Sequence, residues 1–304
     1  METAKSSAHP LVILNPFANR GKIHSYRALL RPYLEQEQAE YIETGRSGEA
    51  RNLAIRAADE GRAVIIVGGD GSIHEVANGI LSTGKRVPLG IIPAGSGNDY
   101  AWHALKLPRD PADALERAFH GRLIEMDAGR VNNRFFVNAF GVGLDANIAA
   151  AANELKRFPF MSGSRLYYTA TLQQLLFGYA RCPWLTFHLD SGAYEQAVEK
   201  RYVLLTVSNG STYGAGFHIN PGADPGDGLF DVCAIDYAPL RRALKLLPVV
   251  KRGEHAELPE VTFYRAKTVR IESRQEVNIL MDGETNSGTS FDVQILPGAL
   301  WVRV

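Results

Sequence analysis

The stretch that decides the fold is Val64 to Leu81, which reads VIIVGGDGSIHEVANGIL. It opens with four consecutive β-branched residues, Val64 to Val67, a pattern typical of a strand covered on both faces in a parallel sheet. The glycine-rich segment Gly68 to Gly71 then predicts a sharp turn whose backbone can approach a ligand closely. A helix is expected next, with Ser72 as its N-cap and Glu75 as the partner in a capping box. The turn and the helix N-terminus together predict an anion site, because N–H groups and the positive end of the helix dipole point at one place.

Asp70 is the unusual residue of this turn, because it places a carboxylate where an anion would bind. A bare phosphate would repel that carboxylate, so an intervening Mg2+ ion is the natural resolution. A second strand and turn follow, with Pro88 to Pro93 as a short apolar strand and Ala94 to Asp99 as another polar, glycine-broken turn. Either turn alone would fit an ordinary connection between a strand and a helix. Two such turns, each carrying an Asp, favour a ligand site at the carboxyl edge of a parallel sheet.

Composition limits the class of protein. The 304 residues include 45% hydrophobic residues, enough to bury a proper core, and 33 basic residues balance 33 acidic ones, so no global field attracts nucleic acid. The two cysteines, Cys182 and Cys233, have no metal-binding spacing and fit a reducing compartment. The first residues, METAKSSAHP, lack an apolar segment, and no uninterrupted membrane span follows. We therefore expect a cytoplasmic protein whose membrane contact, if it has any, is local and peripheral, and the pattern does not predict an oligomeric state.

The first part of the chain alternates predicted strands with predicted helices. Strands are expected at residues 11–14, 39–44, 64–67 and 88–93. This alternation is typical of a doubly wound α/β nucleotide-binding domain, here residues 1–126. The carboxyl edge of its sheet would collect Asn15, Thr44, Asp70 and Ser96.

The polar loops at this edge supply the predicted nucleotide contacts. In the loop after the first strand, Asn19, Arg20 and Lys22 suit phosphates or ribose, although the same residues would also solvate and cap an ordinary turn. The residues expected to contact ATP or ADP are Asn15, Pro16, Phe17, Ala18, Asn19, Thr44, Gly69, Asp70, Gly71, Ser72, Ile73, His74, Glu75 and Ser96.

The pattern of predicted elements changes near Met126. From Asp127 to about residue 290 short strands follow one another at a density typical of an antiparallel β-sandwich-like domain. Two helical inserts interrupt it, Ile148 to Tyr179 and Pro239 to Arg252. The second insert has the form of a basic amphipathic helix that could lie on a bilayer, but a surface helix covering a sheet has the same pattern. Both interpretations stay open.

Seven motifs in order resemble one known family. They are Asn15-Pro16 with Gly21-Lys22, Gly68-Gly-Asp-Gly-Ser72 with Glu75, Pro93-Ala-Gly-Ser-Gly-Asn-Asp99, Gly141-Val-Gly-Leu-Asp-Ala146, Ser208-Asn-Gly210, Asp227-Gly-Leu-Phe-Asp231 and Asp282-Gly-Glu284. In combination they resemble the diacylglycerol kinase catalytic-domain superfamily, specifically its soluble bacterial lipid kinases. The resemblance implies ATP-dependent transfer of a γ-phosphate to a lipid hydroxyl of diacylglycerol type, at an interdomain cleft with Mg2+. It also implies that the chain end, about residues 291–304, returns to the first domain.

Two acidic turns in the second domain carry the remaining predicted sites. The Asp227 carboxylate, together with backbone oxygens at Asp224 and Leu229, could hold a hard cation, although Asp-Gly pairs are mostly just turns. The resemblance implies a structural Mg2+ at these positions. Asp282 ends a short apolar strand, and we expect it to accept the proton of the lipid hydroxyl. The companion Glu284 would then orient the active-site Mg2+. The other predicted ligands of that ion are Asp70 and Asp99. The reverse assignment of Asp282 and Glu284 stays open, because one glycine separates the two carboxylates.

Two other functions compete with the lipid kinase. An NAD kinase would share the glycine-rich Asp turn and the α/β plus β architecture, but its Ser/Thr-rich segment is not found here. A nucleotide-binding regulator without catalysis would have no use for a general base, so the retained carboxylates argue against it. The sequence does not identify the acceptor lipid, because acyl pockets are built from interchangeable apolar residues.

Overall fold

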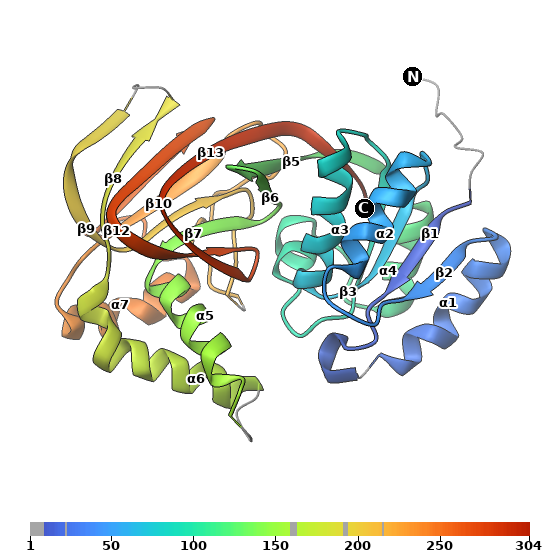
Figure 1. The fold of residues 1–304 in the computed structure, drawn as a ribbon, viewed down its shortest axis with the longest axis horizontal. Coiled ribbons are helices and arrows are strands. Elements are labelled where there is room, and N and C mark those ends of the chain that lie inside the picture. The colour runs from blue at the N-terminus through green and yellow to red at the C-terminus, as the bar shows by residue number, and fades with distance from the viewer. Residues whose placement is uncertain (1–8, 22, 159–162, 191–193, 215) are drawn as a thin grey trace. The chain divides into compact units, whose positions relative to one another are not determined.

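The computed structural model describes residues 9–21, 23–158, 163–190, 194–214 and 216–304 (Figure 1). The chain forms two compact units. Unit 1 comprises residues 1–128, 134–137 and 296–304, and unit 2 comprises residues 129–133 and 138–295. The last residues of the chain are therefore part of the first unit.

Unit 1 is built on a parallel sheet. Its strands are β1 (Leu11–Leu14), β2 (Glu40–Glu43), β3 (Val64–Gly68) and β4 (Pro88–Pro93), in the order β4-β3-β1-β2. The end of β13 (Glu284–Arg303) adds to β4 in parallel through Trp301 and Val302. The buried runs of β1 and β3 explain this placement, because strands in the middle of a parallel sheet need apolar residues on both faces.

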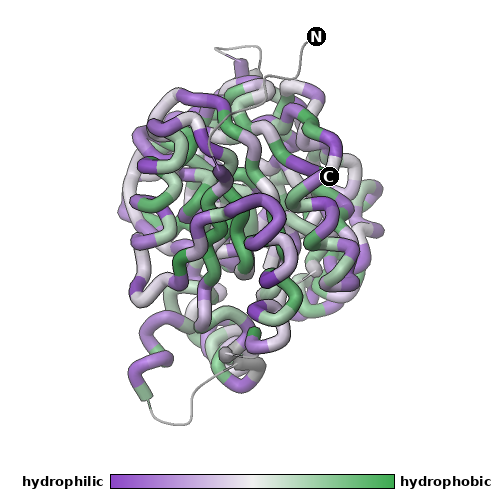
Figure 2. Tube along the Cα trace, turned by 90° about the vertical axis from the view of Figure 1, so that its right-hand side faces the viewer, coloured by the Kyte–Doolittle hydropathy of each residue, from purple (hydrophilic) through white to green (hydrophobic). Residues whose placement is uncertain are grey.

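Helices cover both faces of this sheet. The helices are α1 (His24–Gln36), α2 (Glu49–Asp59), α3 (Asp70–Thr83) and α4 (Pro111–His120), with short turns η1 (Ala18–Gly21) and η2 (Tyr100–Ala104). One core joins α2 and α3 to alternate strand residues such as Ile13 and Ile66, and a second core joins α1 and α4 to the intervening ones, such as Val12 and Ile65. Hydrophobic and hydrophilic residues alternate along the trace (Figure 2), as expected when one side of each helix packs on a sheet. The doubly wound prediction is confirmed.

Unit 2 is built of antiparallel strands. They are β7 (Ala139–Gly143), β8 (Trp184–Leu189), β9 (Tyr194–Ser208), β10 (Phe230–Asp236), β11 (Val261–Ala266), β12 (Thr268–Met281) and the first part of β13. The strand β5 (Leu123–Val131) pairs with β13 and with β6 (Arg134–Phe136). Both β7 and β8 pair with β9 and with β12, so the two long strands close a ring. The strands β9 and β12 are long enough for this arrangement, because each of them pairs with different strands along its length.

Three helices pack on these strands. They are α5 (Leu144–Leu155), α6 (Gly163–Gln173) and α7 (Leu240–Arg252), and the π-turn η3 (Gln174–Gly178) and the 3-10 turn η4 (Tyr179–Arg181) continue from α6. The first helical insert begins four residues earlier than Ile148, and residues 159–162 within it lie outside the described residues. Across the described residues, no helix combines the length and apolar character needed to cross a membrane.

Candidate active-site residues

The two glycine-rich turns of unit 1 pack directly against each other. A Cβ atom placed on Gly69 would lie 2.9 Å from the Cα atom of Gly95, and one placed on Gly95 would lie 2.5 Å from the Cα atom of Gly69. Any side chain at either position would therefore push the turns apart. Asn98 adopts a left-handed φ of 59°, and its side chain is bonded to both the N–H and the C=O of Gly95. The structure thus brings together the two turns that the sequence singled out.

Asp70 holds the second turn in place. Its Oδ2 accepts a hydrogen bond from the backbone N–H of Asn98 at 2.7 Å, and its Oδ1 accepts one from Tyr100 at 3.4 Å. Two amide donors stabilise the ionised carboxylate. Asp99, next to these amides, is buried at the start of η2. The hard carboxylate oxygens of Asp70 and Asp99 on adjoining turns are a donor set that suits Mg2+.

The loop after β1 is tied to the same place. Asn15 donates from Nδ2 to the Ser72 hydroxyl at 2.8 Å, and its Oδ1 accepts from the amide of Phe17 at 2.9 Å. The Phe17 ring is largely exposed, and Thr44 at the end of β2 is buried with its amide bonded to Leu14. Of the other loop residues proposed for phosphate contact, Lys22 lies outside the described residues.

The start of α3 differs from the sequence prediction. The helix begins at Asp70 with Gly69 as N-cap, three residues earlier than it would with Ser72 as N-cap. Glu75 does not form a capping box: its carboxylate accepts hydrogen bonds from the Gly48 amide at 2.9 Å and the Ser47 hydroxyl at 3.2 Å, at the start of α2. The prediction was wrong because the glycine turn starts the helix itself and a neighbouring loop satisfies the glutamate.

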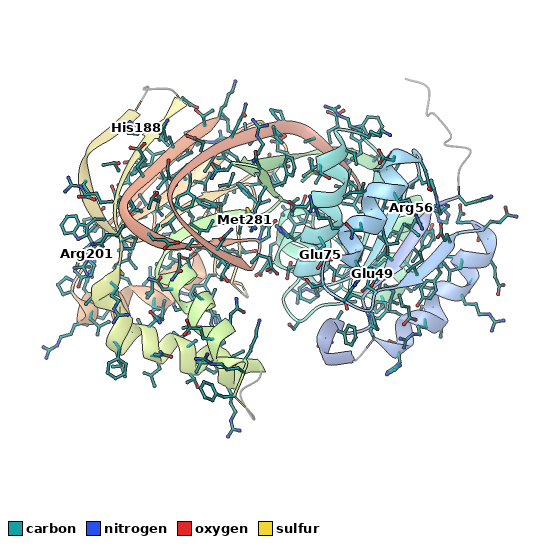
Figure 3. All side chains as sticks on the ribbon, in the orientation of Figure 1. Glu49, Arg56, Glu75, His188, Arg201 and Met281 are labelled. Carbon is teal, nitrogen blue, oxygen red and sulfur yellow. The ribbon has the colours of Figure 1, made fainter. Side chains whose placement is uncertain are left out.

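The remaining predicted nucleotide contacts have different surroundings. Glu49 and Glu75 lie beside the loop between β2 and α2 (Figure 3), where Glu49 accepts from the Gly45 amide at 2.7 Å. Ile73 belongs to the core, and His74 is buried beside Asn78. Ser96, in contrast, is exposed on the second glycine turn.

Asp282 lies in unit 2 at a tight hairpin. Met281 of β12 pairs with Glu284 of β13, and the two residues between them have positive φ, 46° at Asp282 and 92° at Gly283. Asp and Gly are the residues that such two-residue turns favour. The Asp282 Oδ1 accepts from the amides of Asn138 at 2.9 Å and Ala139 at 3.1 Å. This carboxylate is therefore anchored by the backbone of the neighbouring strand.

Glu284 has quite different surroundings. Its side chain is exposed, and its carboxylate has no hydrogen bond or ion pair with the part of the chain that the structure describes. The Asp282 carboxylate is thus engaged by two backbone amides, whereas that of Glu284 accepts no hydrogen bond from the described residues. The contacts therefore distinguish the two carboxylates that the sequence left interchangeable.

Asn138 was missed by sequence reasoning. It is buried, its carbonyl accepts from Asn209 at 2.8 Å and Gly210 at 3.1 Å, and its side-chain Nδ2 donates to the Thr212 carbonyl. It thus connects the Ser208-Asn-Gly210 motif to the Asp282 hairpin. The connection depends on residues far apart in the chain, so no local pattern signals it.

Asp145 is a second residue without an assigned role. Its Oδ2 accepts from the Tyr213 hydroxyl at 2.8 Å, while its Oδ1 is enclosed and accepts no hydrogen bond from the described residues. Burial raises the pKa of this carboxyl to about 6, and the Tyr213 hydroxyl opposes that shift. Gly141 leaves room for the pair, because a Cβ atom there would collide with the Asp145 carboxylate.

The acidic turn before β10 gathers three carboxylates. Asp224 and Asp227 accept hydrogen bonds within the turn, from Gly226 at 3.1 Å and Leu229 at 3.0 Å. Arg265 pairs with Asp227 and lies 3.8 Å from Asp231.

Asp231 is the carboxylate of this group whose pKa is shifted by its surroundings. Burial raises the pKa of its carboxyl to about 6, Arg265 lowers it, and the negative charges of Asp227 and Asp224 raise it further. Its Oδ2 is buried and accepts no hydrogen bond within the described chain. Such oxygens suit a hard cation, but no set of three His, Cys, Asp or Glu side chains among the described residues forms a metal cage alone.

The basic residues of α7 fall into two groups, those with a contact to a neighbouring side chain and those that are exposed without an ion pair. Arg242 forms hydrogen bonds of 2.7 and 3.1 Å with Glu260, and Arg252 pairs with Glu254 at 2.7 Å. Lys251 lies over the ring of Phe217. Leu246 and Val250 are buried, so the helix does cover the domain. The residues Arg241 and Lys245 remain exposed without an ion pair in the described part of unit 2.

Comparison with known proteins covers both units. Residues 9–131 match the model of the diacylglycerol kinase catalytic domain, and residues 138–304 match that of the YegS C-terminal NAD kinase beta sandwich-like domain. A diacylglycerol kinase from Mycobacterium tuberculosis is 32% identical over 264 residues, covering 85% of this chain and 82% of the relative. Another from Staphylococcus carnosus is 30% identical, covering 90% and 87%. A solved diacylglycerol kinase structure from Bacillus anthracis shares the fold with a TM-score of 0.73 at 21% identity, covering 96% and 95%.

Proposed function

The chain belongs to the diacylglycerol kinase family, and we propose that this lipid kinase transfers the γ-phosphate of ATP to the hydroxyl of a diacylglycerol-like lipid with Mg2+. The observation that carries the proposal is the contact between the two glycine turns, fixed by Asp70. Amide-rich turns at the carboxyl edge of a parallel sheet suit a polyphosphate, and a carboxylate among them suits its metal ion.

Unit 1 would bind the nucleotide through the loops at this edge. Asn15 and Ser72 are already bonded to each other, which fixes the first loop against the start of α3. Open space at Gly71 leaves the backbone approachable from outside. The exposed ring of Phe17 is available for stacking on a base. Mg2+ held by the carboxylates of Asp70 and Asp99 would neutralise the charge of the phosphates.

Unit 2 would supply the proton acceptor. We propose Glu284 for this role and Asp282 as a positioning residue, the reverse of the assignment expected from the sequence. Asp282 uses its carboxylate to anchor the hairpin to Asn138 and Ala139, whereas Glu284 extends from the same hairpin without such bonds. A hydroxyl that attacks a phosphoryl group must lose its proton, and a carboxylate within hydrogen-bond reach, directly or through one water, can accept it.

A second cation would stabilise the acidic turn. We propose a structural Mg2+ at the Asp227 carboxylate and the backbone oxygens of Asp224 and Leu229, supported by the neighbouring Asp231, whose Oδ2 is buried and accepts no hydrogen bond from the described residues. Water would have to complete its coordination, since Mg2+ takes six oxygen ligands.

The substrate assay is direct. The purified protein is incubated with labelled ATP, Mg2+ and separate micelles of diacylglycerol, monoacylglycerol, a sphingoid base or phosphatidylglycerol, and in parallel with NAD. Label should appear in the product of a lipid alcohol and not in NADP. Label in NADP alone would instead support an NAD kinase, and nucleotide binding without transfer to any acceptor would support a regulator.

A further inference from the structure

Asn78 of α3 binds the backbone of β6 with its whole side-chain amide. Its Oδ1 accepts a hydrogen bond from the N–H of Phe135 at 3.0 Å, and its Nδ2 donates to the C=O of the same residue at 2.9 Å. A neighbouring antiparallel strand would supply the same pair of bonds. Asn78 is buried, so water competes little for these bonds. The side chain therefore fixes both the position and the orientation of the backbone at Phe135.

The strand β6 depends on this side chain for its place beside α3. It is three residues long, and among the described residues β5 is its one strand partner. The N–H and C=O of Phe135 would need another partner if Asn78 were removed, because backbone polar groups away from water are costly to leave unpaired. An apolar residue at position 78 could pack against β6, but it would not fix the register of the strand.

The same helix begins in the turn proposed to bind the nucleotide. Helix α3 starts at Asp70, and Asn78 is eight residues further on, about 12 Å along the helix axis. Next to Asn78, Gly79 packs so closely on α2 that a Cβ atom there would lie 2.5 Å from the carbonyl oxygen of Arg51. Helix α3 is therefore held firmly by α2, and β6 is bonded to a helix whose own position is fixed.

The chain runs directly from β6 to the hairpin of Asp282 and Glu284. Asn138 comes three residues after Phe135, and the amides of Asn138 and Ala139 are the donors to the Asp282 carboxylate. The Asp282 amide returns a hydrogen bond of 3.0 Å to the Ala139 carbonyl. Three residues of extended chain span at most about 10 Å, so little slack separates the bonds of Asn78 from those of Asp282. This short segment crosses from unit 1 to unit 2.

We propose that Asn78 is a positioning residue for phosphoryl transfer, which holds residues 135–139 on α3 and thereby sets the position of the hairpin that carries Glu284. The proposal rests on the proposed function, because it takes the Asp70 turn as the nucleotide site and Glu284 as the proton acceptor. Transfer needs its reacting groups closely aligned, and a misplacement of about 1 Å can cost about 100-fold in rate. Asn78 is buried against β6, so it acts through the hairpin and not by touching the phosphates.

The test compares two variants of Asn78 with a matched control on the same helix. Asn78→Ala removes both bonds to Phe135, whereas Asn78→Asp keeps the shape and the acceptor of the side chain, so that it retains the fold while it loses the donated bond. The control, Ile80→Val, removes a methyl group from the buried core of unit 1 and destabilises it without changing a bond to β6.

Three quantities are measured for each protein. Hydrogen exchange of residues 135–139 and 281–284 is followed without ATP or lipid, with β10 of unit 2 as an internal reference. The dissociation constant of ATP is measured by titration calorimetry, and kcat is measured with saturating ATP and diacylglycerol. Urea unfolding gives the loss of stability, so that the Asn78 variants and Ile80→Val are compared at known stability.

We expect exchange in both segments to be about tenfold faster, or more, in the two Asn78 variants, with exchange in β10 unchanged. Their kcat should fall roughly 10- to 100-fold while the affinity for ATP stays within about twofold, and Ile80→Val should keep its kcat. Unchanged exchange at residues 281–284 overturns the proposal. So does a fall in kcat no greater than the loss in Ile80→Val at comparable stability, which would leave Asn78 a purely structural role. Faster hairpin exchange in a protein that phosphorylates no lipid would refute the proposed function, while the link between Asn78 and the hairpin stands.

Discussion

The Asp70 carboxylate accepts a 2.7 Å hydrogen bond from the backbone amide of Asn98, so a side chain of the first glycine turn determines the position of the second. The residues lie on different strand-to-helix connections, and Gly69 and Gly95 meet between them. An acidic residue in this place does two things: it closes the contact between the turns and leaves a hard oxygen donor beside their amides. The same residue thus links the stability of the turns to their proposed chemistry.

The glycines of these turns have separable roles. Gly71 has open space around the position of a Cβ atom, so Gly71→Val should fold normally, yet its side chain would occupy the approach to the turn and weaken ATP binding. Gly95→Ala instead pushes against Gly69 and should destabilise the protein by about 1–3 kcal/mol. Isothermal titration with ATP and urea unfolding separate the two effects. Normal ATP affinity in a folded Gly71→Val protein would show that the nucleotide does not bind at this turn.

The two carboxylates of the hairpin can also be separated. Glu284→Gln should lower kcat by about 10²- to 10⁴-fold, the usual contribution of a general base, with little change in unfolding free energy because Glu284 is exposed. Asp282→Asn keeps an oxygen acceptor for the Asn138 amide and a residue type that tolerates positive φ, so it should lose less activity. Turnover and circular dichroism are measured for both. A larger loss of kcat in folded Asp282→Asn would restore the assignment expected from the sequence.

The fold was largely predictable because its signals are local. Runs such as Val64 to Val67 and the glycines that follow them mark strands and turns wherever they occur, and the predicted parallel sheet follows from their spacing. The start of α3 was not predictable, because Glu75 bonds to Gly48, a residue that a capping pattern does not include. The changes of pairing partner along β9 and β12 were also not predictable, because they depend on strands that lie far apart in the sequence.

The candidate site was predictable in its residues more than in their roles. Asp282 and Glu284 are separated by one glycine, so spacing alone cannot distinguish them. What distinguishes them is the pair of amides at Asn138 and Ala139, more than 140 residues away in the chain. The surroundings of Asp145 were unpredictable for the same reason, because they depend on Tyr213, a residue far away in the sequence.

The acidic turn before β10 should respond to Mg2+. Binding of the ion to Asp224 and Asp227 stabilises the folded protein by mass action, so Tm should rise with Mg2+ concentration in the absence of nucleotide. Asp227→Asn should abolish that rise, while Asp292→Asn, which removes an exposed carboxylate elsewhere in unit 2, should preserve it. Differential scanning fluorimetry against Mg2+ measures both. An equal rise in the two variants would argue that the ion stabilises the protein elsewhere.

Stability should depend on the protonation of Asp145. Burial raises the pKa of its carboxyl in the folded protein to about 6 from an ordinary value of 3.8. As pH rises from about 4 to 6 the unfolded chain loses this proton first, so the folded protein loses stability, by about 2–3 kcal/mol at neutral pH. Asp145→Asn removes the ionisation and should gain stability relative to the unmodified protein between pH 5 and 7.5. Urea unfolding across that range checks the prediction, and curves that stay parallel for the two proteins would contradict it.

The Tyr213 hydroxyl offers a control on that measurement. It opposes the raised pKa by donating to Asp145, so Tyr213→Phe should raise the pKa further. The loss of stability would then extend to higher pH. Tyr213→Phe in the Asp145→Asn background should leave the pH dependence unchanged, because the group that titrates is absent.

The charges of α7 should contribute to membrane binding according to whether they are already paired. Arg241 and Lys245 have no ion pair in the described part of unit 2, so both are available to anionic headgroups, whereas Arg252 is held by Glu254. A basic group near such a surface contributes about 1 kcal/mol, so Arg241→Ala with Lys245→Ala should lower partition onto vesicles containing phosphatidylglycerol by roughly 30-fold at low salt.

The matched control for α7 removes the same charge from unit 1, by Arg31→Ala with Lys85→Ala. Cosedimentation at low and high salt compares the two variants, and the difference between them should shrink as salt screens the headgroups. Arg252→Ala alone should change binding less than Arg241→Ala alone, because its charge is already neutralised by Glu254. Equal losses in the α7 variant and the unit 1 control would show that net charge, and not the position of Arg241 and Lys245, governs attraction to the membrane.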